Sequence, residues 1–172
     1  MDTTYSITRL SAETNLTGFD CGDEDLNNFL FEDALKNQCD LISVTKIMQQ
    51  NASIIGYYTL VPDTLERGRI SLSDKIEGYP YRKYPTHKLA RLAVDKNYQK
   101  KGYGGKLLGE FFKDVWLLIA EEGGRFITVD ARNDAVEFYK HYGFCVVKSA
   151  KDNETVPMYL DVSKYYRQTY DL

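Results

Sequence analysis

A short strand that leads into a glycine-rich loop and then into a helix is the feature of this sequence that does most to limit its fold. Residues 89–108 read Leu-Ala-Arg-Leu-Ala-Val-Asp-Lys-Asn-Tyr-Gln-Lys-Lys-Gly-Tyr-Gly-Gly-Lys-Leu-Leu, with glycines at 102, 104 and 105. Glycines let backbone N–H groups approach a ligand closely, and the first turn of a helix presents unpaired N–H groups at the positive end of its dipole. The stretch therefore predicts an α/β domain that binds an anion, and a diphosphate suits it well.

Two other glycine loops of known spacing do not fit. The phosphate loop of nucleoside triphosphatases requires Gly, four residues and then Gly-Lys-Ser/Thr, but Leu107 follows Gly105-Lys106 and position 100 is a lysine. The dinucleotide-binding fingerprint requires a third glycine where this chain has Leu107. A purely structural interpretation stays open, in which the glycines only allow the helix to pack closely on its strand.

Positive charge is concentrated around this loop. The chain has a net charge of -3, but residues 81–106 contain eight lysines and arginines against Asp95 alone. A protein that coats nucleic acid is usually basic overall, and this one is not. The pattern indicates a polyanionic ligand held in one place, with a solvated basic loop as the alternative.

Length and composition predict one globular domain. The chain has 172 residues, of which 43% are hydrophobic, so residues 1–172 are expected to form a single domain with one core. It contains no apolar run of about 18 residues, and its first residues lack the features of a secretory signal. Its three cysteines are widely spaced, which is typical of free thiols in a reducing compartment. A cytoplasmic location is expected.

Hydrophobic periodicity predicts a mixed α/β fold. One helix is expected after Asp23 as its N-cap, and a second from the glycine loop to about Glu122, ended by Gly123-Gly124. A third is expected to start at the capping-box-like pair Asp134 and Glu137 and to end at Gly143. Residues 62–86 are expected to be irregular, and the tail to Leu172 to include a helical turn. The expected strands cover residues 5–10, 41–48, 53–61, 87–94, 125–129, 144–148 and 155–160, with a hairpin link at 49–52. The sheet would thus have six to seven strands, antiparallel in its N-terminal half and parallel in the centre, flanked by about four helices.

Two segments resemble the GNAT superfamily of N-acetyltransferases. Gln99-Lys-Lys-Gly-Tyr-Gly104 matches the Gln/Arg-x-x-Gly-x-Gly/Ala signature of that family, after the expected strand and at the start of the expected helix. Asp130-Ala-Arg-Asn-Asp-Ala-Val-Glu-Phe-Tyr-Lys-His-Tyr-Gly-Phe144 is similar to the second conserved segment of the family. The resemblance covers about residues 40–160 and implies acetyl-CoA as co-substrate, with no metal.

The resemblance also implies which residues hold acetyl-CoA. The strand containing Leu92, Ala93 and Val94 would splay from its neighbour and pair with the pantetheine amides, and Asn133 would hydrogen-bond the pantetheine or order its turn. Tyr139 would lie near the coenzyme sulfur. The diphosphate would be held by the loop residues Gln99, Lys100, Lys101, Gly102, Tyr103, Gly104 and Gly105.

The implied reaction is attack of a neutral amine on the thioester, with a backbone N–H near Leu92 stabilising the oxyanion. A free thiol has a pKa of about 8.5, so a hydroxyl can assist the departing thiolate, and Tyr139 is the candidate general acid; core packing is its alternative role. The general base stays unassigned among His87, Asp95, Asp130, Glu66 and Asp63, with His141 a weaker candidate. An α-amine, with a pKa of about 8, needs less help from a base than a lysine does.

Three further segments resemble a bacterial subgroup of GNAT toxins that acetylate the amino acid on charged tRNA. They are Phe19–Leu30, Gly56–Leu60 and Lys88–Val94. Such toxins pair with ribbon-helix-helix antitoxins, so the resemblance implies tRNA, an antitoxin and a homodimer as partners. The chain departs from the subgroup in its net negative charge and in its loop, which reads Gln-Lys-Lys-Gly-Tyr-Gly-Gly where Gln-Gly-x-Gly-x-Gly is commoner. A small-molecule or protein amine therefore remains an alternative acceptor, and a non-catalytic module that senses acyl-CoA or scaffolds a partner is the alternative function.

Overall fold

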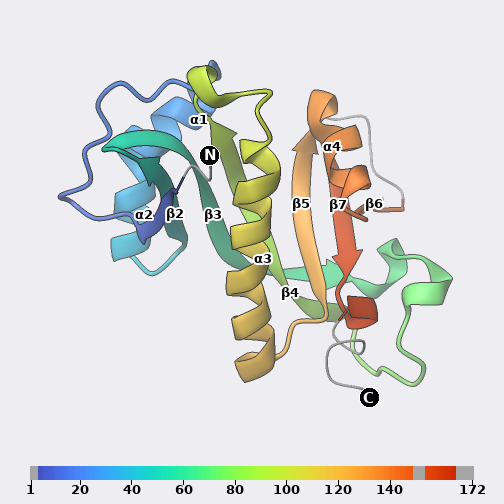
Figure 1. Cartoon of the computed structure of the whole chain (residues 1–172). Coiled ribbons are helices and arrows are strands. Elements are labelled where there is room, and N and C mark those ends of the chain that lie inside the picture. Colours follow the sequence, from blue (N-terminus) through green and yellow to red (C-terminus); the bar gives the residue numbers. More distant parts are fainter. Residues whose placement is uncertain (1–3, 149–153, 166–172) are drawn as a thin grey trace. The chain divides into compact units, whose positions relative to one another are not determined.

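Seven strands form one mixed sheet in the computed structural model, which describes residues 4–148 and 154–165 (Figure 1). Their order is β1-β2-β3-β4-β5-β7-β6, and β4 and β5 run parallel. The predicted number of strands and the parallel centre are thus confirmed. The strands are β1 (Ser6–Arg9), β2 (Val44–Gln50), β3 (Ser53–Glu66), β4 (Lys83–Val94), β5 (Phe126–Arg132), β6 (Cys145–Val146) and β7 (Thr155–Asp161).

Four α-helices accompany these strands in the described part of the chain. They are α1 (Glu24–Asn28), α2 (Ala34–Cys39), α3 (Tyr103–Glu122) and α4 (Val136–His141), and a π-helical turn over Phe29–Asp33 joins α1 to α2. Asp23 caps α1 as predicted, because its Oδ1 accepts a hydrogen bond from Leu26 N at 3.0 Å. Gly123 and Gly143, both with positive φ, follow α3 and α4 as predicted. No helix in this part of the chain is both long and apolar enough to cross a membrane.

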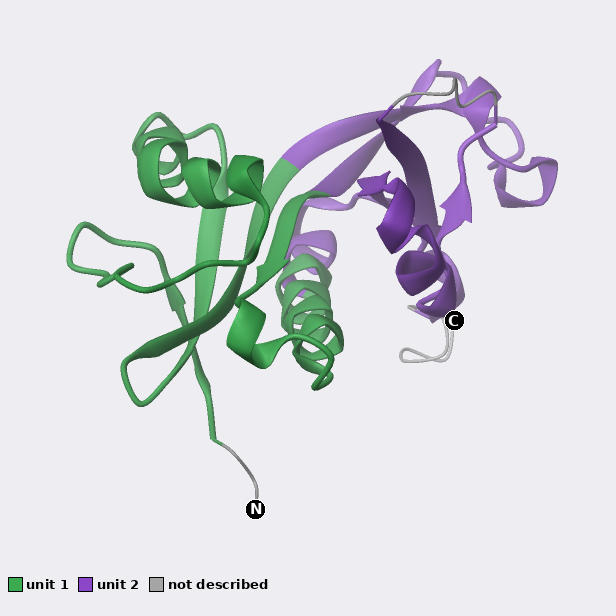
Figure 2. Cartoon of the chain, turned by 90° about the horizontal axis from the view of Figure 1, so that it is seen from above, with its two compact units in different colours: residues 1–61, 89–116 green, residues 62–88, 117–172 purple. Residues whose placement is uncertain are grey.

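The chain divides into two compact units (Figure 2). Unit 1 comprises Met1–Val61 and Leu89–Trp116, and unit 2 comprises Pro62–Lys88 and Leu117–Leu172. Strands β3 and β4 contribute residues to both units, whereas the glycine loop belongs to unit 1 and α4 to unit 2.

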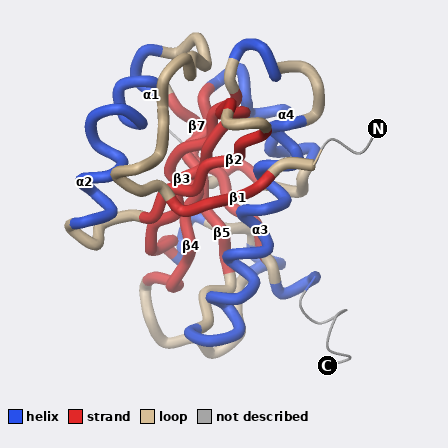
Figure 3. Tube along the Cα trace, turned by 60° about the vertical axis from the view of Figure 1, so that its left-hand side comes forward, coloured by secondary structure: helices blue, strands red, loops and turns tan. Residues whose placement is uncertain are grey.

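In unit 1, helices cover both faces of the strands (Figure 3). Tyr57 and Tyr58 are adjacent in β3 and therefore point to opposite faces. Tyr57 packs against Phe29 on the α1–α2 side, whereas the Tyr58 ring lies 5.9 Å from the ring of Phe111 in α3. Phe111 is fully buried, and burial of such a side chain contributes roughly 1.5–3 kcal/mol. Leu107, Leu108 and Val115, apolar residues that recur with helical spacing around Phe111, are buried on the same helix.

The β2–β3 hairpin turns more tightly than the sequence indicates. β2 extends to Gln50, which pairs with Ser53, so only Asn51 and Ala52 form the turn. Both have positive φ, at 48° and 64°. This is the backbone of a type I′ turn, whose twist suits antiparallel strands, but alanine is an uncommon residue for it.

The prediction that residues 62–86 are irregular is wrong at both ends. β3 continues through Pro62 to Glu66 and β4 begins at Lys83, and beyond them Arg67 N donates to Arg82 O at 2.8 Å. Proline is tolerated in a strand where its nitrogen is not required as a donor. The segment between the strands is anchored in unit 2, because Tyr159 OH donates to buried Asp74 at 2.7 Å.

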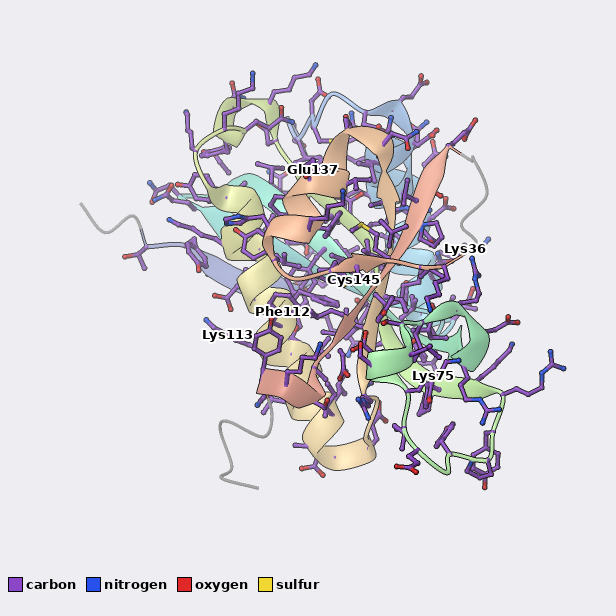
Figure 4. The ribbon with its side chains drawn as sticks, turned by 90° about the vertical axis from the view of Figure 1, so that its right-hand side faces the viewer. Lys36, Lys75, Phe112, Lys113, Glu137 and Cys145 are labelled. Atoms are coloured by element: carbon purple, nitrogen blue, oxygen red, sulfur yellow. The ribbon has the colours of Figure 1, made fainter. Side chains whose placement is uncertain are left out.

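Two other predictions in unit 2 need correction. The capping box at Asp134 and Glu137 is wrong, because a 3₁₀ turn over Asn133–Ala135 precedes α4 and no side chain caps either element. The strand expected at residues 144–148 is limited to Cys145–Val146, and Figure 4 labels Cys145 on it. The described part of the tail includes a helical turn at residues 163–165, and residues 166–172 lie outside the described residues.

Candidate functional site

Asp95 organises the loop that follows β4. Its side chain is buried, and its Oδ1 accepts hydrogen bonds from Asn97 N at 2.9 Å and from Asn97 Nδ2 at 3.0 Å. Its Oδ2 accepts from Asp20 N at 2.9 Å. Because both carboxylate oxygens are occupied in holding the chain, the geometry does not favour Asp95 as the general base.

Gln99, the first residue of the loop signature, holds the loop against its own strand. Its side-chain Nε2 donates to Cys21 O at 2.8 Å and to Val94 O at 2.9 Å, and its backbone N–H donates to Asp95 O at 3.1 Å. The Gln99 amide and the Val94 carbonyl, both predicted to contact coenzyme, are therefore engaged within the protein. The backbone groups available to a ligand are other ones, in the start of α3 and in β4.

The backbone from Lys100 to Gly105 has the geometry of an anion site. Lys100 and Gly102 have φ values of 58° and 83°, which turn the chain into α3. The helix begins at Tyr103, and Lys106 N donates to Gly102 O at 3.2 Å. The amides of Tyr103, Gly104 and Gly105 precede that first helical bond, so they are among the donors that a helix N-terminus leaves for a ligand or a cap.

Two lysines flank the start of α3 in the sequence, and their ammonium groups contact neighbouring residues of the loop and helix. Lys101 Nζ donates to Asn97 O at 2.7 Å, and Lys106 Nζ lies 4.9 Å from the centre of the Tyr103 ring. Lys96, by contrast, is paired with Asp20 at 2.6 Å, and the pKa of that carboxyl is lowered to about 2 because the lysine, Asn27 and the Gly22 amide all donate to it. The positive charge of the basic run is therefore neutralised at Lys96, and the lysines nearer the helix start are held by a carbonyl and a ring.

The pairing of β4 with β3 shows which of its backbone groups face away from β3. Asp95 N donates to Ile55 O at 2.8 Å, and a Cβ added to Gly56 would collide with Ala93 O. Successive residues of a strand direct their N–H and C=O groups to opposite sides. Leu92 and Val94 therefore direct their backbone groups away from β3, as an amide-bearing ligand alongside the strand would require, whereas those of Ala93 face β3.

In unit 2, Tyr139 is a buried tyrosine at the centre of α4. Only 6% of its surface is exposed, and its ring packs against Phe138 and Phe144 at centroid distances of 5.1 and 5.5 Å. Burial raises the pKa of Tyr139 well above its ordinary value of about 10. The hydroxyl therefore keeps its proton at neutral pH and is a hydrogen-bond donor.

Asn133 occupies the turn between β5 and α4. It is exposed and begins a 3₁₀ turn, and the N-cap positions belong to Arg132 and Ala135. Asn133 therefore does not act as a helix cap. Its predicted contact with pantetheine remains a prediction.

Comparison with known proteins identifies this arrangement. The family model described as an acetyltransferase (GNAT) domain matches residues 45–146, which include β4, the loop, α3 and α4. The chain belongs to the GNAT acetyltransferase family. The strand, the glycine loop and the second segment ending at Phe144 are thus correctly assigned to a GNAT domain.

Individual GNAT relatives resemble the chain over most of its length. A tRNA-acetylating toxin of Mycobacterium tuberculosis (strain ATCC 25618 / H37Rv) is 29% identical over 143 residues, which cover 79% of this chain and 81% of the relative. The structure of AtaT complexed with acetyl-methionyl-tRNAfMet has a TM-score of 0.86 at 28% identity, covering 96% of this chain and 99% of that one. A tyrosine-to-phenylalanine mutant of the AtaT toxin, bound to the C-terminus of the antitoxin AtaR and to acetyl-CoA, has a TM-score of 0.77 at 26% identity, with 98% and 99% covered.

Among the candidate bases of this GNAT domain, His87 has a structural role. It is buried, its Nε2 lies 3.0 Å from Gly123 O, and a Cβ added to Gly124 would lie 2.5 Å from the same nitrogen. His87 therefore packs against the turn that ends α3. Glu66 and His141 are exposed, at the end of β3 and of α4.

The remaining candidates, Asp63 and Asp130, share one lysine. Lys88 Nζ lies 2.6 Å from Asp130 Oδ2 and 3.9 Å from Asp63 Oδ2. Thr128 completes the cluster by donating to Asp63 Oδ2 at 2.8 Å. Sequence reasoning gave no role to Lys88 or Thr128; the available signal was the placement of polar residues at alternate positions in strands that are otherwise buried.

Proposed function

We propose that this protein is an acetyl-CoA-dependent N-acetyltransferase whose acceptor is the α-amino group of an aminoacyl-tRNA. The observation that carries the proposal is the helix N-terminus at Tyr103–Gly105, with its unpaired amides and adjacent lysines, in a chain that belongs to the GNAT family. The likeness to a tRNA-acetylating toxin and to AtaT with its acetylated tRNA supports the choice of acceptor. A cytoplasmic location follows, because charged tRNA is found there.

The residues fit the parts of acetyl-CoA in order along the chain. We propose that the amides of Lys100 to Gly105 bind the diphosphate, since they lie at the positive end of α3 and close to Lys101 and Lys106. The backbone N–H and C=O of Leu92 and the N–H of Val94, which face away from β3, would pair with the pantetheine amides. The side chain of Gln99 holds the loop in place through its bonds to Cys21 O and Val94 O. Asn133 would contact the same arm from the turn after β5.

Bound acetyl-CoA supplies a thioester whose carbon accepts the amine. Attack forms the N–C bond, and the C–S bond then breaks to release the thiol of coenzyme A. We propose that a backbone N–H near Leu92 stabilises the oxyanion and that Tyr139 donates a hydrogen bond to the departing sulfur. The acceptor must lose a proton before it attacks, and an α-amine does so readily because its pKa is close to 8.

Thiol release with a panel of acceptors tests the function. The purified protein is mixed with acetyl-CoA and with charged tRNA, uncharged tRNA, a lysine-containing peptide or a polyamine, and the product is identified by mass spectrometry. We expect release only with charged tRNA, with the acetyl group on the amino acid. Thiol release with the peptide or the polyamine, and not with charged tRNA, would show that the acceptor is a protein or small-molecule amine. Tight binding of acetyl-CoA without release on any acceptor would instead favour the sensing module.

We also propose that an antitoxin controls the enzyme, since the AtaT mutant toxin binds the C-terminus of AtaR. A small reading frame next to the gene is expected to encode a ribbon-helix-helix protein. Added in excess to the thiol-release assay, that protein should co-elute with the enzyme and suppress turnover at least tenfold, whereas an unrelated ribbon-helix-helix protein should not. Full turnover in a stable complex would contradict the proposal. The expected homodimer stays a prediction.

A further inference from the structure

A charged cluster lies on one face of the unit 2 strands. It is formed by Asp63 in β3, Lys88 in β4, and Thr128 and Asp130 in β5, through the contacts of 2.6, 2.8 and 3.9 Å given above. These four residues are called the acid cluster here. With two carboxylates and one ammonium, its formal charge is -1, and its carboxylates and ammonium are a quarter to a half exposed.

The acid cluster continues a face whose other end is apolar. Leu65, Tyr84 and Phe126 pack together in one core cluster. Side chains two residues apart in a strand share a face, so the residues two and four positions along from these three lie on that face too. Those residues are Asp63, Thr86, Lys88, Thr128 and Asp130.

Thr86 adds an unmet hydrogen-bonding demand to this face. Its side chain is 4% exposed, and its Oγ1 has no hydrogen-bond partner among the residues that the structure describes. Buried hydroxyls are nearly always paired, so an unpaired one in a native protein calls for a specific explanation. Thr86 Oγ1 is therefore a donor without a described acceptor, two residues from Lys88 on the same face of β4.

Compensation of charge within the acid cluster is uneven. Lys88 contacts Asp130 closely but lies 3.9 Å from Asp63, which otherwise accepts only the neutral hydroxyl of Thr128 in the described contacts. Asp63 is thus the carboxylate with charge left to balance. It offers acceptor capacity to a cation, and Thr86 offers a donor, on the same face and in the same unit.

We propose that the acid cluster binds the acceptor substrate through its ammonium group, with Asp63 receiving N–H hydrogen bonds and the Thr86 hydroxyl donating to a carbonyl oxygen. The class of ligand is an α-aminoacyl group, which carries an ammonium and a carbonyl two bonds apart. The identity of the full acceptor rests on the proposed function, but the binding chemistry does not. The cluster acts in binding, and the ammonium releases its proton to solvent before attack.

The test measures binding in the absence of acetyl-CoA and of turnover. L-Amino acid methyl esters are titrated onto the full-length protein by NMR or calorimetry, and each is compared with its N-acetyl counterpart, which lacks the ammonium. We expect the wild-type protein to prefer the free amine at least tenfold. Asp63→Asn should reduce that preference to less than twofold, and Thr86→Val should weaken both ligands, because it removes the donor for the carbonyl.

A matched control is Glu137→Gln, at the position on α4 that Figure 4 labels. It changes an exposed carboxylate whose lysine partner, Lys140, is 2.7 Å away. It should leave the preference unchanged. If Asp63→Asn does not fold, Asp130→Asn serves instead, because the Asp130 side chain is 48% exposed and tolerates substitution more readily. The loss of Asp130 leaves Lys88 free to pair with Asp63, so this variant should also prefer the free amine less. In the acetylation assay, Asp63→Asn should raise KM for the acceptor about tenfold, with unchanged kcat and unchanged affinity for acetyl-CoA.

The outcomes separate this proposal from the proposed function. Equal binding of both esters by the wild-type protein, or a preference that survives Asp63→Asn in a folded protein, would overturn the acid cluster as an ammonium site. A lower melting temperature with no change in preference would overturn it too, in favour of a strand-bridging role. Failure of charged tRNA as a substrate, with the ester preference intact, would overturn only the tRNA acceptor.

Discussion

Gly104→Glu should abolish binding of acetyl-CoA while leaving the protein folded. Gly104 is the second residue of α3, and its amide is one of those that precede the first intrahelical hydrogen bond. A carboxylate there would face the diphosphate. Two unit charges about 4 Å apart repel by about 4 kcal/mol at an effective dielectric constant of about 20, which is about a thousandfold in Kd. Calorimetric titration of acetyl-CoA should therefore show a loss of at least a hundredfold.

The stability of this variant should not fall, since Glu in the first turn of a helix interacts favourably with its dipole and Gly is a poor helix former. Gly104→Ala separates the bulk of a Cβ from the charge and should lose much less affinity. Gly109→Glu places the same charge further along α3, where an added Cβ meets no described atom within 4 Å. It should bind normally. Retention of wild-type affinity by Gly104→Glu would mean that the diphosphate is not held by this loop.

The parts of the fold that could be predicted are those that local sequence specifies. The strand, loop and helix over residues 89–122 follow from hydrophobic periodicity and from the glycines of the loop, among which Gly102 has a positive φ. The Asp23 cap is equally local, because its hydrogen bond reaches only three residues along the chain. Each of these predictions needed no knowledge of what lies across the sheet.

The parts that could not be predicted depend on contacts that are distant in sequence. Gln99 reads as a signature residue, but the contact of its side chain with Cys21 O spans 78 positions, so its support of the loop could not be predicted locally. The extension of β3 through Pro62 depends on the partner strand, which overrides the local signal of a proline. The capping box is wrong because Asp134 lies within a 3₁₀ turn and the N-cap position of α4 is Ala135, one residue later.

The sequence located a candidate coenzyme-binding loop but left the general base open, because the two depend on contacts of different range in sequence. Backbone amides at a helix start are fixed by the chain itself, so the sequence is sufficient to locate them. A base or an ammonium site is made by side chains from several strands, as Asp63 and Asp130 are joined through Lys88. Five candidate bases could therefore be named from sequence, but the bonds that occupy Asp95 and His87 could not.

Tyr139→Phe should lower kcat about a hundredfold and leave the Kd for acetyl-CoA within about twofold of wild type. The change removes one oxygen from a buried ring that is otherwise held by Phe138 and Phe144, so packing is preserved. General acids contribute about 10²–10⁴-fold. The lower end applies because burial raises the pKa of Tyr139 above that of a thiol, which makes complete proton transfer to the thiolate unfavourable. Hydrogen-bond donation to the developing charge is then the main contribution.

The pH dependence distinguishes this role from simple packing. The pKa of Tyr139 is raised by burial, so its donating form persists through pH 10 and is lost only above it. The wild-type rate should therefore rise as the acceptor amine deprotonates near pH 8 and then stay level to about pH 10. Tyr142→Phe is the matched control. Tyr142 lies just after the end of α4 and packs against Phe138, so its loss of a hydroxyl should leave kcat unchanged. A large increase in the Kd for acetyl-CoA with Tyr139→Phe, at unchanged kcat, would assign Tyr139 to coenzyme binding instead of acid catalysis.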